Sequence, residues 1–147
     1  MVTITIDGKQ ISVDENLSIL EAAQEADVKI PTLCYLKDVN EVGACNRHLV
    51  TSCNTKVKEG MVVNTHSERV VNSRKQVLNM LLANHDIRCF SCSKSGDCRL
   101  QDLSNEYGIT KSCYPGSAAK FEAKKENPFL TYYPELCINC QRCVSTC

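Results

Sequence analysis

Ten of the eleven cysteines in this 147-residue chain fall into three groups whose spacing is typical of metal ligands. The central group adds a histidine to three cysteines at the spacing H-x3-C-x2-C-x5-C, and its members are His85, Cys89, Cys92 and Cys98. One imidazole and three thiolates can hold a structural zinc ion or an iron–sulfur cluster, and the spacing leaves both open. His85 alone would fit a histidine that complements the dipole at a helix end, but its place just ahead of the cysteine run favours a ligand.

The last group has the most specific spacing. Cys137, Cys140, Cys143 and Cys147 follow C-x2-C-x2-C-x3-C, the run found in bacterial ferredoxins. In that run the first three thiolates bind one [4Fe-4S] cluster and the fourth reaches a second cluster. A single zinc ion more often has two separated C-x2-C pairs. Because electron carriers work in chains, this run also favours iron–sulfur over zinc for the central group. The fourth ligand of the first cluster is expected beyond residue 147, so the segment looks cut short.

The first group offers three of the four ligands that a [2Fe-2S] cluster needs, namely Cys34, Cys45 and Cys53. His48 stands at the C-x2-X position after Cys45 and could complete the set, since histidine ligates a [2Fe-2S] iron in Rieske centres. An incidental histidine is the simpler interpretation. Cys113 stands outside all three groups, and we expect it to be a buried or incidental free thiol.

The totals argue against several classes of function. Acidic and basic residues balance at 17 each, so the net charge does not point to nucleic acid or to an anionic membrane. No apolar run approaches the roughly 18 residues of a membrane span, and residues 1–7 alternate like a strand rather than a signal peptide. We therefore expect a cytoplasmic protein, where many cysteines suggest metal sites more than disulfides. There is neither a G-x-G-x-x-G loop nor a cysteine beside an evident base, so no independent active site is expected.

The elements that must position these groups follow from hydrophobic periodicity. Residues 2–6 alternate like a strand, Asp7-Gly8 marks a hairpin turn, and a helix begins at Asn16 or Ser18 and ends near Ala26. Four apolar residues of this helix would face the sheet: Ile19, Ala22, Ala23 and Ala26.

Further along the chain, Leu49-Val50 and residues 61–63 are expected to add strands, with a turn at residues 58–60. A helix is predicted from Ser67 to Asn84, ending just before His85, and its apolar stripe would comprise Val70, Val71, Val77, Leu78, Leu81 and Leu82. A second helix is predicted from Arg99 to Tyr107, stopped by Gly108. Residues 114–127 are expected to form a mobile connection.

With these residues in view, the chain resembles the N-terminal iron–sulfur region shared by [FeFe]-hydrogenases, the large iron–sulfur subunit of NADH dehydrogenases and related NAD-linked formate dehydrogenases. The resemblance covers essentially the whole chain and is carried by Ile30-Pro31-Thr32-Leu33-Cys34-Tyr35, Gly43-Ala44-Cys45, Leu49-Val50-Thr51-Ser52-Cys53, Leu81-Leu82-Ala83-Asn84-His85 with the cysteines that follow, and Asn127-Pro128-Phe129. One departure lies after Cys45. The family pattern has a third cysteine there at C-x2-C, then a strand and a turn, whereas here Asn46-Arg47-His48 leads straight into Leu49.

The resemblance implies an α+β protein of three parts. Residues 1–66 would form a β-grasp ferredoxin-like [2Fe-2S] domain with Cys34, Cys45 and Cys53. Residues 67–113 would form a small helical domain with a [4Fe-4S] cluster on His85, Cys89, Cys92 and Cys98. Residues 114–147 would hold a linker and the first half of a 4Fe-4S ferredoxin-like domain.

The resemblance also implies a function. The chain would relay electrons within a multi-subunit NAD(P)- or ferredoxin-linked oxidoreductase, such as an electron-bifurcating [FeFe]-hydrogenase. Its partners would be a flavin- and NAD(P)-binding subunit, a thioredoxin-like [2Fe-2S] subunit and ferredoxin. The alternative is a zinc-stabilised interaction module built on the central group, and colour separates the two because an iron–sulfur protein is brown.

Overall fold

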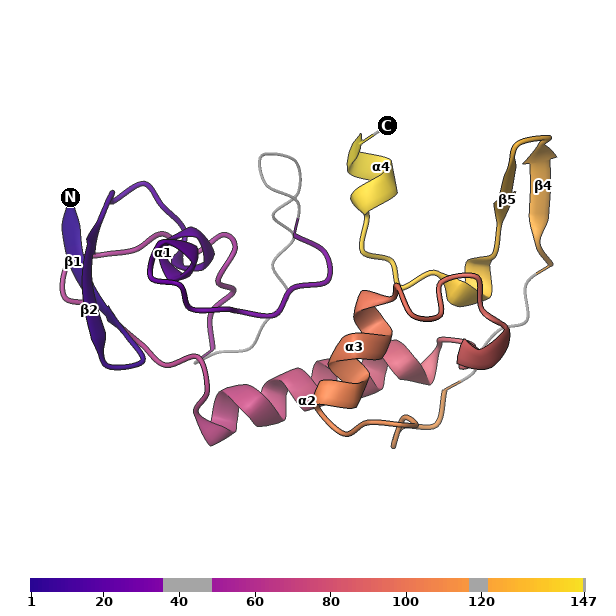
Figure 1. Ribbon diagram of the computed structural model, residues 1–147, viewed down its shortest axis with the longest axis horizontal. Helices are drawn as coiled ribbons and strands as arrows, with labels where there is room; N and C mark the ends of the chain where they lie inside the picture. Colours follow the sequence, from indigo (N-terminus) through magenta and orange to yellow (C-terminus); the bar gives the residue numbers. More distant parts are fainter. Residues whose placement is uncertain (36–48, 117–121, 147) are drawn as a thin grey trace. The chain divides into compact units, whose positions relative to one another are not determined.

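The computed structural model describes residues 1–35, 49–116 and 122–146 (Figure 1). These residues form a small mixed α and β protein that divides into two compact units, residues 1–71 with 141–147 and residues 72–140. Three candidate ligands, Cys45, His48 and Cys147, lie outside the described residues.

The first unit begins with a β-hairpin. Strands β1 (Val2–Ile6) and β2 (Lys9–Val13) pair antiparallel. Ile4 and Ile6 of β1 are almost fully buried, because alternate side chains of the strand point into the core. The turn residues Asp7-Gly8 have φ angles of 49° and 84°, and a two-residue type I′ turn needs positive φ at both positions. The predicted hairpin is confirmed.

Helix α1 (Ile19–Glu25) packs its apolar face into the same core. Ser18 caps it through a capping box: the Ser18 Oγ accepts from the Glu21 N–H at 3.3 Å, and the Glu21 Oε2 accepts from the Ser18 N–H at 2.7 Å. Ser18 is therefore the cap, and Asn16 is not. The residues predicted to face the sheet are all buried: Ile19, Ala22, Ala23 and Ala26.

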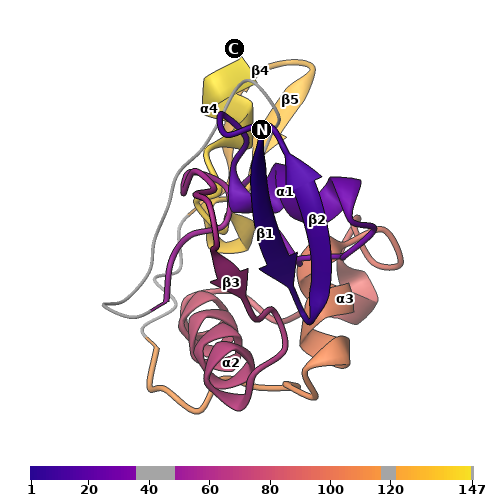
Figure 2. The same ribbon diagram turned by 90° about the vertical axis from the view of Figure 1, so that its left-hand side faces the viewer.

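A short parallel strand completes the sheet. Strand β3 (Val62–Val63) lies beside β1, with Thr5 opposite Val62, which gives the strand order β2-β1-β3 (Figure 2). A turn that ends at Gly60, with a φ of 72°, delivers the chain to it. The predicted strand over residues 61–63 and the turn before it are confirmed, except that the strand is one residue shorter than predicted.

The predicted strand at Leu49-Val50 is wrong. These two residues are irregular, and the Val50 side chain is 63% exposed. The carbonyl groups of the residues that follow accept hydrogen bonds from the start of α1 and not from a neighbouring strand. The Leu20 N–H donates to the Ser52 carbonyl at 2.8 Å, and the Ile19 N–H donates to the Thr55 carbonyl at 2.9 Å. The start of a helix needs such acceptors, and here they come from a turn.

Two helices occupy the middle of the chain. Helix α2 (Glu68–Ala83) and helix α3 (Arg99–Glu106) have the predicted limits within two residues. Ser67 begins α2, since its Oγ accepts from the Val70 N–H at 3.4 Å. The expected stripe of α2 is only partly buried: Leu78 and Leu82 are buried, whereas Val77 is 43% exposed.

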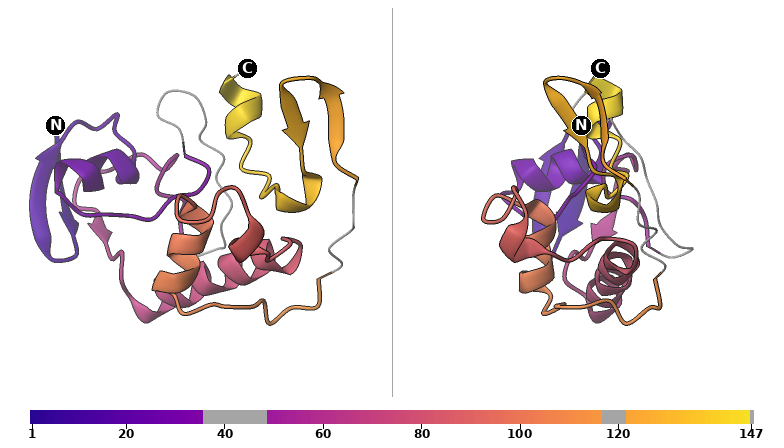
Figure 3. Two further views of the ribbon diagram at one scale, coloured as in Figure 1. Left: turned by 45° about the vertical axis from the view of Figure 1, so that its right-hand side comes forward. Right: turned by 90° about the vertical axis from the view of Figure 1, so that its right-hand side faces the viewer.

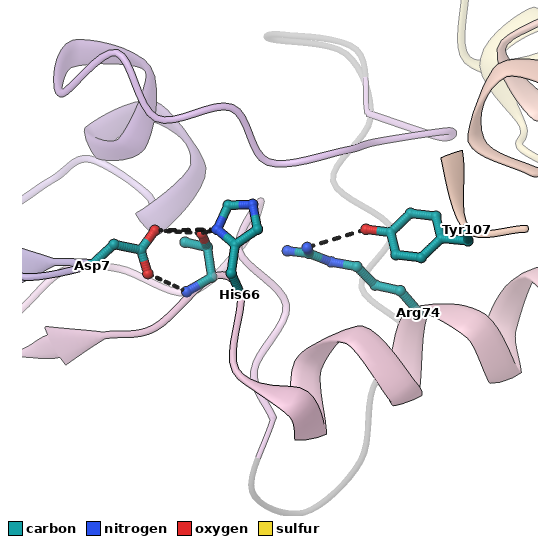
Figure 4. A network of polar contacts seen from close by, with 5 residues as sticks. Asp7, His66, Arg74 and Tyr107 are labelled. Atoms are coloured by element: carbon teal, nitrogen blue, oxygen red, sulfur yellow. Dashed lines mark hydrogen bonds and ion pairs between the residues drawn. The ribbon is translucent and has the colours of Figure 1, made fainter. Parts of the chain in front are cut away.

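In the second unit, the buried apolar residues of α2 and α3 are two leucines on each helix: Leu78, Leu82, Leu100 and Leu103. The Arg74 Nη1 donates to the Tyr107 hydroxyl at 3.3 Å and joins α2 to the end of α3 (Figure 4). Gly108 follows with a φ of 67°, as the prediction of a helix stop requires.

The chain ends in short elements. Strands β4 (Lys124–Asn127) and β5 (Leu130–Tyr132) form an antiparallel hairpin (Figure 3). The expected mobile connection over residues 114–127 is therefore corrected, because its last four residues pair as a strand. A 3-10 turn, η2 (Pro134–Leu136), and helix α4 (Arg142–Thr146) follow. No helix in the described part of the chain is both long and apolar enough to span a bilayer.

The Asp7 carboxylate, just after β1, holds the chain segment that follows β3. The Asp7 carboxylate accepts from the Thr65 N–H at 2.7 Å and from the Thr65 hydroxyl, and the His66 Nδ1 lies 3.5 Å from it (Figure 4). Burial raises the pKa of Asp7, but the hydrogen bonds from Thr65 and the nearby His66 outweigh burial and hold the pKa below its usual value.

Candidate metal centres

His85 lies two residues beyond Ala83, where α2 ends, close to the predicted position, and its side chain is half-buried. The imidazole Nδ1 is a buried atom without a hydrogen-bond partner in the described structure. Burial lowers the pKa of His85, and the Asp86 carboxylate offsets this only in part. The ring is therefore kept neutral, which leaves a nitrogen lone pair available to a metal.

A buried nitrogen without a partner costs free energy unless something else binds it. A ligand role for His85 supplies that partner. The structure thus favours the ligand interpretation over the helix-end interpretation, which needs a charged ring.

The three cysteines of the central group sit on a tight loop between α2 and α3. Cys89 opens the 3-10 turn η1 (Cys89–Ser91), and the Cys92 N–H donates to the Cys89 carbonyl at 3.2 Å. Cys98 is the N-cap of α3 and makes no side-chain cap hydrogen bond. All three thiols are half-buried and free of disulfides.

The loop gives one of these sulfurs a backbone donor. The Lys94 N–H lies 3.5 Å from the Cys92 Sγ, with an N–H···S orientation. Gly96, with a φ of 82°, turns the chain back toward α3, and its N–H donates to the Gln101 Oε1 at 3.1 Å. Amide donors to sulfur stabilise thiolate ligands and tune the clusters that they hold.

The sulfur and nitrogen donors of the central group fit a soft metal centre, but in this structure the side chains are not arranged around one point as metal ligands would be. Among the described residues, no three histidine, cysteine or acidic side chains are grouped closely enough to hold a metal ion. The thiols are kept apart on the loop. Metal binding and local folding are commonly coupled in small cysteine-rich domains, so we regard the loop as a set of donors that the cofactor draws together.

The C-terminal group begins at the end of η2. Cys137 closes this turn, with its N–H donating to the Pro134 carbonyl at 3.1 Å. The Asn139 N–H donates to the Cys137 Sγ at 3.4 Å, which repeats the N–H···S contact of the central loop. Asn139 and Gln141, which flank Cys140, have positive φ angles of 53° and 60°. Cys140 is half-buried.

The third cysteine of this run, Cys143, is exposed on α4, which belongs to the other unit. Cys147 lies outside the described residues.

Only two members of the N-terminal group are described. Cys53 is buried in the turn whose carbonyl groups cap α1, and Cys34 is half-buried. Cys45 and His48 lie outside the described residues, so the question of a fourth ligand stays as the sequence left it.

Cys113 is an exposed free cysteine, so of the two predicted alternatives the structure supports the incidental free thiol. Its N–H donates to the Asn79 Oδ1 at 3.0 Å, and the neighbouring Ser112 hydroxyl donates to the Asn79 carbonyl at 2.7 Å. The segment is held to α2 by its backbone, not by its thiol.

Two residues that lie near the candidate ligands in the chain were not predicted from the sequence. Arg88, which precedes Cys89, forms an ion pair with Glu135, which stands two residues before Cys137; the Arg88 Nη2 and Glu135 Oε1 are 2.9 Å apart. The partners are 47 residues apart in the chain, and no local pattern marks such a contact.

Two family models match separate parts of the chain. Residues 1–68 match the family described as a 2Fe-2S iron–sulfur cluster binding domain, and residues 74–112 match the NADH-ubiquinone oxidoreductase-G iron–sulfur binding region. The first match contains Cys34, Cys45 and Cys53, and the second contains the whole central group.

Individual relatives point the same way. The chain is 41% identical to the NADP-reducing hydrogenase subunit HndD of Solidesulfovibrio fructosivorans, with all of this chain and 28% of that protein covered. It is 33% identical to the NAD-reducing hydrogenase HoxS subunit gamma of Cupriavidus necator, with 97% of this chain and 64% of that protein covered. The chain thus spans less than two thirds of the length of these relatives.

A solved structure has the same fold. A chain in the crystal structure of an NAD⁺-reducing [NiFe]-hydrogenase in the H2-reduced state superposes with a TM-score of 0.87 at 32% identity. The match covers 98% of this chain and 64% of the other. Together with the two family matches, this assigns [2Fe-2S] and [4Fe-4S] clusters as the cofactors, and the chain belongs to the family of iron–sulfur regions shared by NAD(P)-linked hydrogenases and the large iron–sulfur subunit of NADH dehydrogenases.

Proposed function

We propose that this chain is an electron relay of a multi-subunit NAD(P)- or ferredoxin-linked oxidoreductase, such as an electron-bifurcating [FeFe]-hydrogenase. The observation that carries the proposal is the His85 imidazole, whose buried Nδ1 lacks a hydrogen-bond partner in the described structure. It stands at the head of a cysteine loop inside the region matched to an iron–sulfur family. When bound, iron–sulfur clusters accept and release single electrons.

Each cluster has a proposed set of ligands. A [2Fe-2S] cluster uses Cys34, Cys45 and Cys53, with His48 as the candidate for the fourth position. A [4Fe-4S] cluster uses the central group, His85 with its three cysteines. A second [4Fe-4S] cluster uses Cys137, Cys140 and Cys143, and Cys147 serves a further cluster of the ferredoxin type. The alignment with HndD extends over 161 positions, more than the 147 residues of this chain, which supports a missing stretch of the kind inferred after Cys45.

The proposed domains follow the clusters. Residues 1–66 form a β-grasp ferredoxin-like domain, supported by the sheet order β2-β1-β3 with α1 packed on the sheet. Residues 67–113 form the helical domain of the central group, and residues 114–147 begin a 4Fe-4S ferredoxin-like domain. The partners are a flavin- and NAD(P)-binding subunit, a thioredoxin-like [2Fe-2S] subunit and ferredoxin, in a cytoplasmic hetero-oligomer. The names of the related hydrogenase subunits support this assembly.

The residues of the chain have distinct tasks in this relay. The thiols bind iron, and those of the central group are half-buried, so the protein shields them in part from water. The Lys94 and Asn139 amides donate to the Cys92 and Cys137 sulfurs, which eases the negative charge that arrives with an electron. His85 contributes a neutral ligand where a thiolate would add a negative charge, so it favours the reduced form of its centre.

The first test is iron and sulfide analysis, with low-temperature EPR, of the anaerobically purified and dithionite-reduced complex. We expect a slowly relaxing [2Fe-2S] signal and fast-relaxing [4Fe-4S] signals. In the Cys89→Ser variant one fast-relaxing signal should disappear. The matched control is Cys113→Ser, which removes an exposed thiol outside the ligand spacing and should leave every signal in place.

The outcomes separate the alternatives. A colourless protein that contains zinc in place of iron would overturn the relay and establish the zinc module. Fast-relaxing signals without a slowly relaxing one would remove the [2Fe-2S] cluster from the proposal and leave the other two centres. Equal losses in Cys89→Ser and Cys113→Ser would refute the assignment of ligands by spacing.

A further inference from the structure

We propose that Arg88 and Glu135 are positioning residues that fix the central cluster relative to the segment that carries Cys137 and Cys140, and so set the electronic coupling between two neighbouring clusters. The inference rests on the proposed function, because it concerns the transfer of one electron in which one centre is oxidised and the other reduced. Neither residue stands at a position of the cysteine spacings that mark the ligands.

Several contacts join the two segments at this place. The Arg88 Nη2 lies 2.9 Å from the Glu135 Oε1, and the Asp86 N–H donates to the Glu135 carbonyl at 3.0 Å. The Arg88 guanidinium also lies over the Tyr133 ring, 5.8 Å from its centroid. Its Nε is 3.4 Å from the Asp86 Oδ2 on its own segment, which orients the guanidinium plane. We call these residues the clasp.

The clasp is built differently from an ordinary surface ion pair. The Glu135 side chain is only 14% exposed, and its Oε2 is buried without a hydrogen-bond partner in the described structure. A buried carboxylate with an unsatisfied oxygen is costly. Exposed ion pairs contribute little. Here the Arg88 side chain is 39% exposed but Glu135 is largely out of water, so removal of Arg88 leaves a mostly buried carboxylate without its partner.

The position of the clasp ties it to electron transfer. Arg88 is adjacent to Cys89 in the chain, and Glu135 is two residues from Cys137. The Cys137 N–H belongs to the same 3-10 turn as Glu135, so a shift of Glu135 is transmitted directly to this ligand. Release of the clasp therefore changes the separation of two ligand segments while every ligand remains present.

The test uses the full-length protein in its anaerobically purified complex. The variants are Arg88→Gln, Glu135→Gln, the conservative Arg88→Lys, and the double exchange of Arg88→Glu with Glu135→Arg. The readouts are iron and sulfide content, the spin–spin broadening between the two reduced [4Fe-4S] centres in EPR, and hydrogen exchange of the Asp86 amide. In each single Gln variant we expect full cluster content, loss of the broadening, and about a tenfold or larger increase in Asp86 exchange, because a hydrogen bond to a charged group is removed.

The control is Asp97→Asn. It removes the carboxylate of the Lys94–Asp97 ion pair, which is exposed, spans 3.0 Å and lies within one segment. This variant should keep the broadening. Arg88→Lys and the double exchange, which retain an ion pair, should restore part of the broadening.

Three results would overturn the clasp. The first is unchanged broadening in both Gln variants. The second is loss of iron in all four variants, which would make the pair an assembly requirement and not a positioning device. The third is the same loss of broadening in Asp97→Asn. If the wild type itself lacks [4Fe-4S] signals, the proposed function has failed, and that outcome is recognised before any variant is compared.

Discussion

The capping box of α1 offers a prediction that links local structure to the N-terminal site. Ser18 is 1% exposed, and in Ser18→Ala two contacts are lost. These are the acceptor of the Glu21 N–H, at 3.3 Å, and the hydroxyl donor to the Glu21 Oε2, at 2.8 Å. The Ser18 N–H to Glu21 contact survives, because it belongs to the backbone.

The magnitude follows from these contacts. Loss of a Ser cap costs about 0.5–2 kcal/mol, and Glu21 is only half-buried, so water replaces part of its lost hydrogen bond. We expect a loss of about 1–2 kcal/mol in the free energy of unfolding of the first unit. With a urea dependence of about 1–3 kcal/mol per M for a small domain, the midpoint should fall by on the order of 0.5–1 M.

The assay combines urea unfolding followed by circular dichroism with hydrogen exchange of the Ile19 and Leu20 amides. These amides donate to the carbonyl groups of Thr55 and Ser52, on either side of Cys53, so faster exchange there reports loosening of the turn that holds this cysteine. Ser12→Ala is the matched control, since Ser12 is exposed on β2 and surface changes stay within about 0.5 kcal/mol. Equal midpoints and equal exchange for Ser18→Ala and Ser12→Ala would refute the reasoning.

Three further predictions concern other parts of the molecule. In Gly116→Ala the new Cβ would lie 1.5 Å from the Ala83 carbonyl oxygen, so the backbone must shift; we expect a loss of about 1–3 kcal/mol by thermal denaturation, and an unchanged melting temperature would contradict the close approach. Asp7 has a pKa held below its usual 3.8, so folding favours the carboxylate, and its contribution is complete above about pH 4 and is lost as the pH falls through the lowered value. Urea midpoints of wild type and Asp7→Asn should therefore differ at pH 7 and converge in acid, whereas a constant difference would exclude the linkage. Removal of iron by an anaerobic chelator should raise hydrogen exchange over residues 85–98 far more than over β1, because the proposed cluster would draw the loop thiols together; equal protection before and after removal would show that the loop is folded without it.

Local chemistry explains what the sequence predicted correctly. Three features depend only on neighbours within a few positions, so a short stretch of sequence is enough to predict them: the alternation of residues 2–6, the turn at Asp7-Gly8 and the capping box at Ser18. The position of His85 at the end of α2 was predicted in the same way, from helical periodicity that stops at Asn84.

Contacts between distant residues were not predictable from such windows. Leu49-Val50 has the composition of a strand, but Ser52 and Thr55, just beyond it, are engaged by the start of α1. Val77 fits the apolar stripe of α2 by spacing, yet in the described part of the chain its side chain remains 43% exposed. The Arg88–Glu135 pair depends on a fold that brings residues 47 positions apart together.

The parallel pairing of β1 with β3 has a consequence for how the protein matures in a cell. The hairpin and α1 form from residues 2–26, whereas Thr5 meets Val62 only after a long loop has closed. Cys34 and Cys53 both lie inside that loop, so a cofactor that joins them shortens the span that remains to be closed and lowers its entropic cost. β1 is the middle strand, and without β3 one of its edges stays unpaired and open to other chains. We therefore expect newly synthesised chains to aggregate, and to be degraded faster, when iron is scarce.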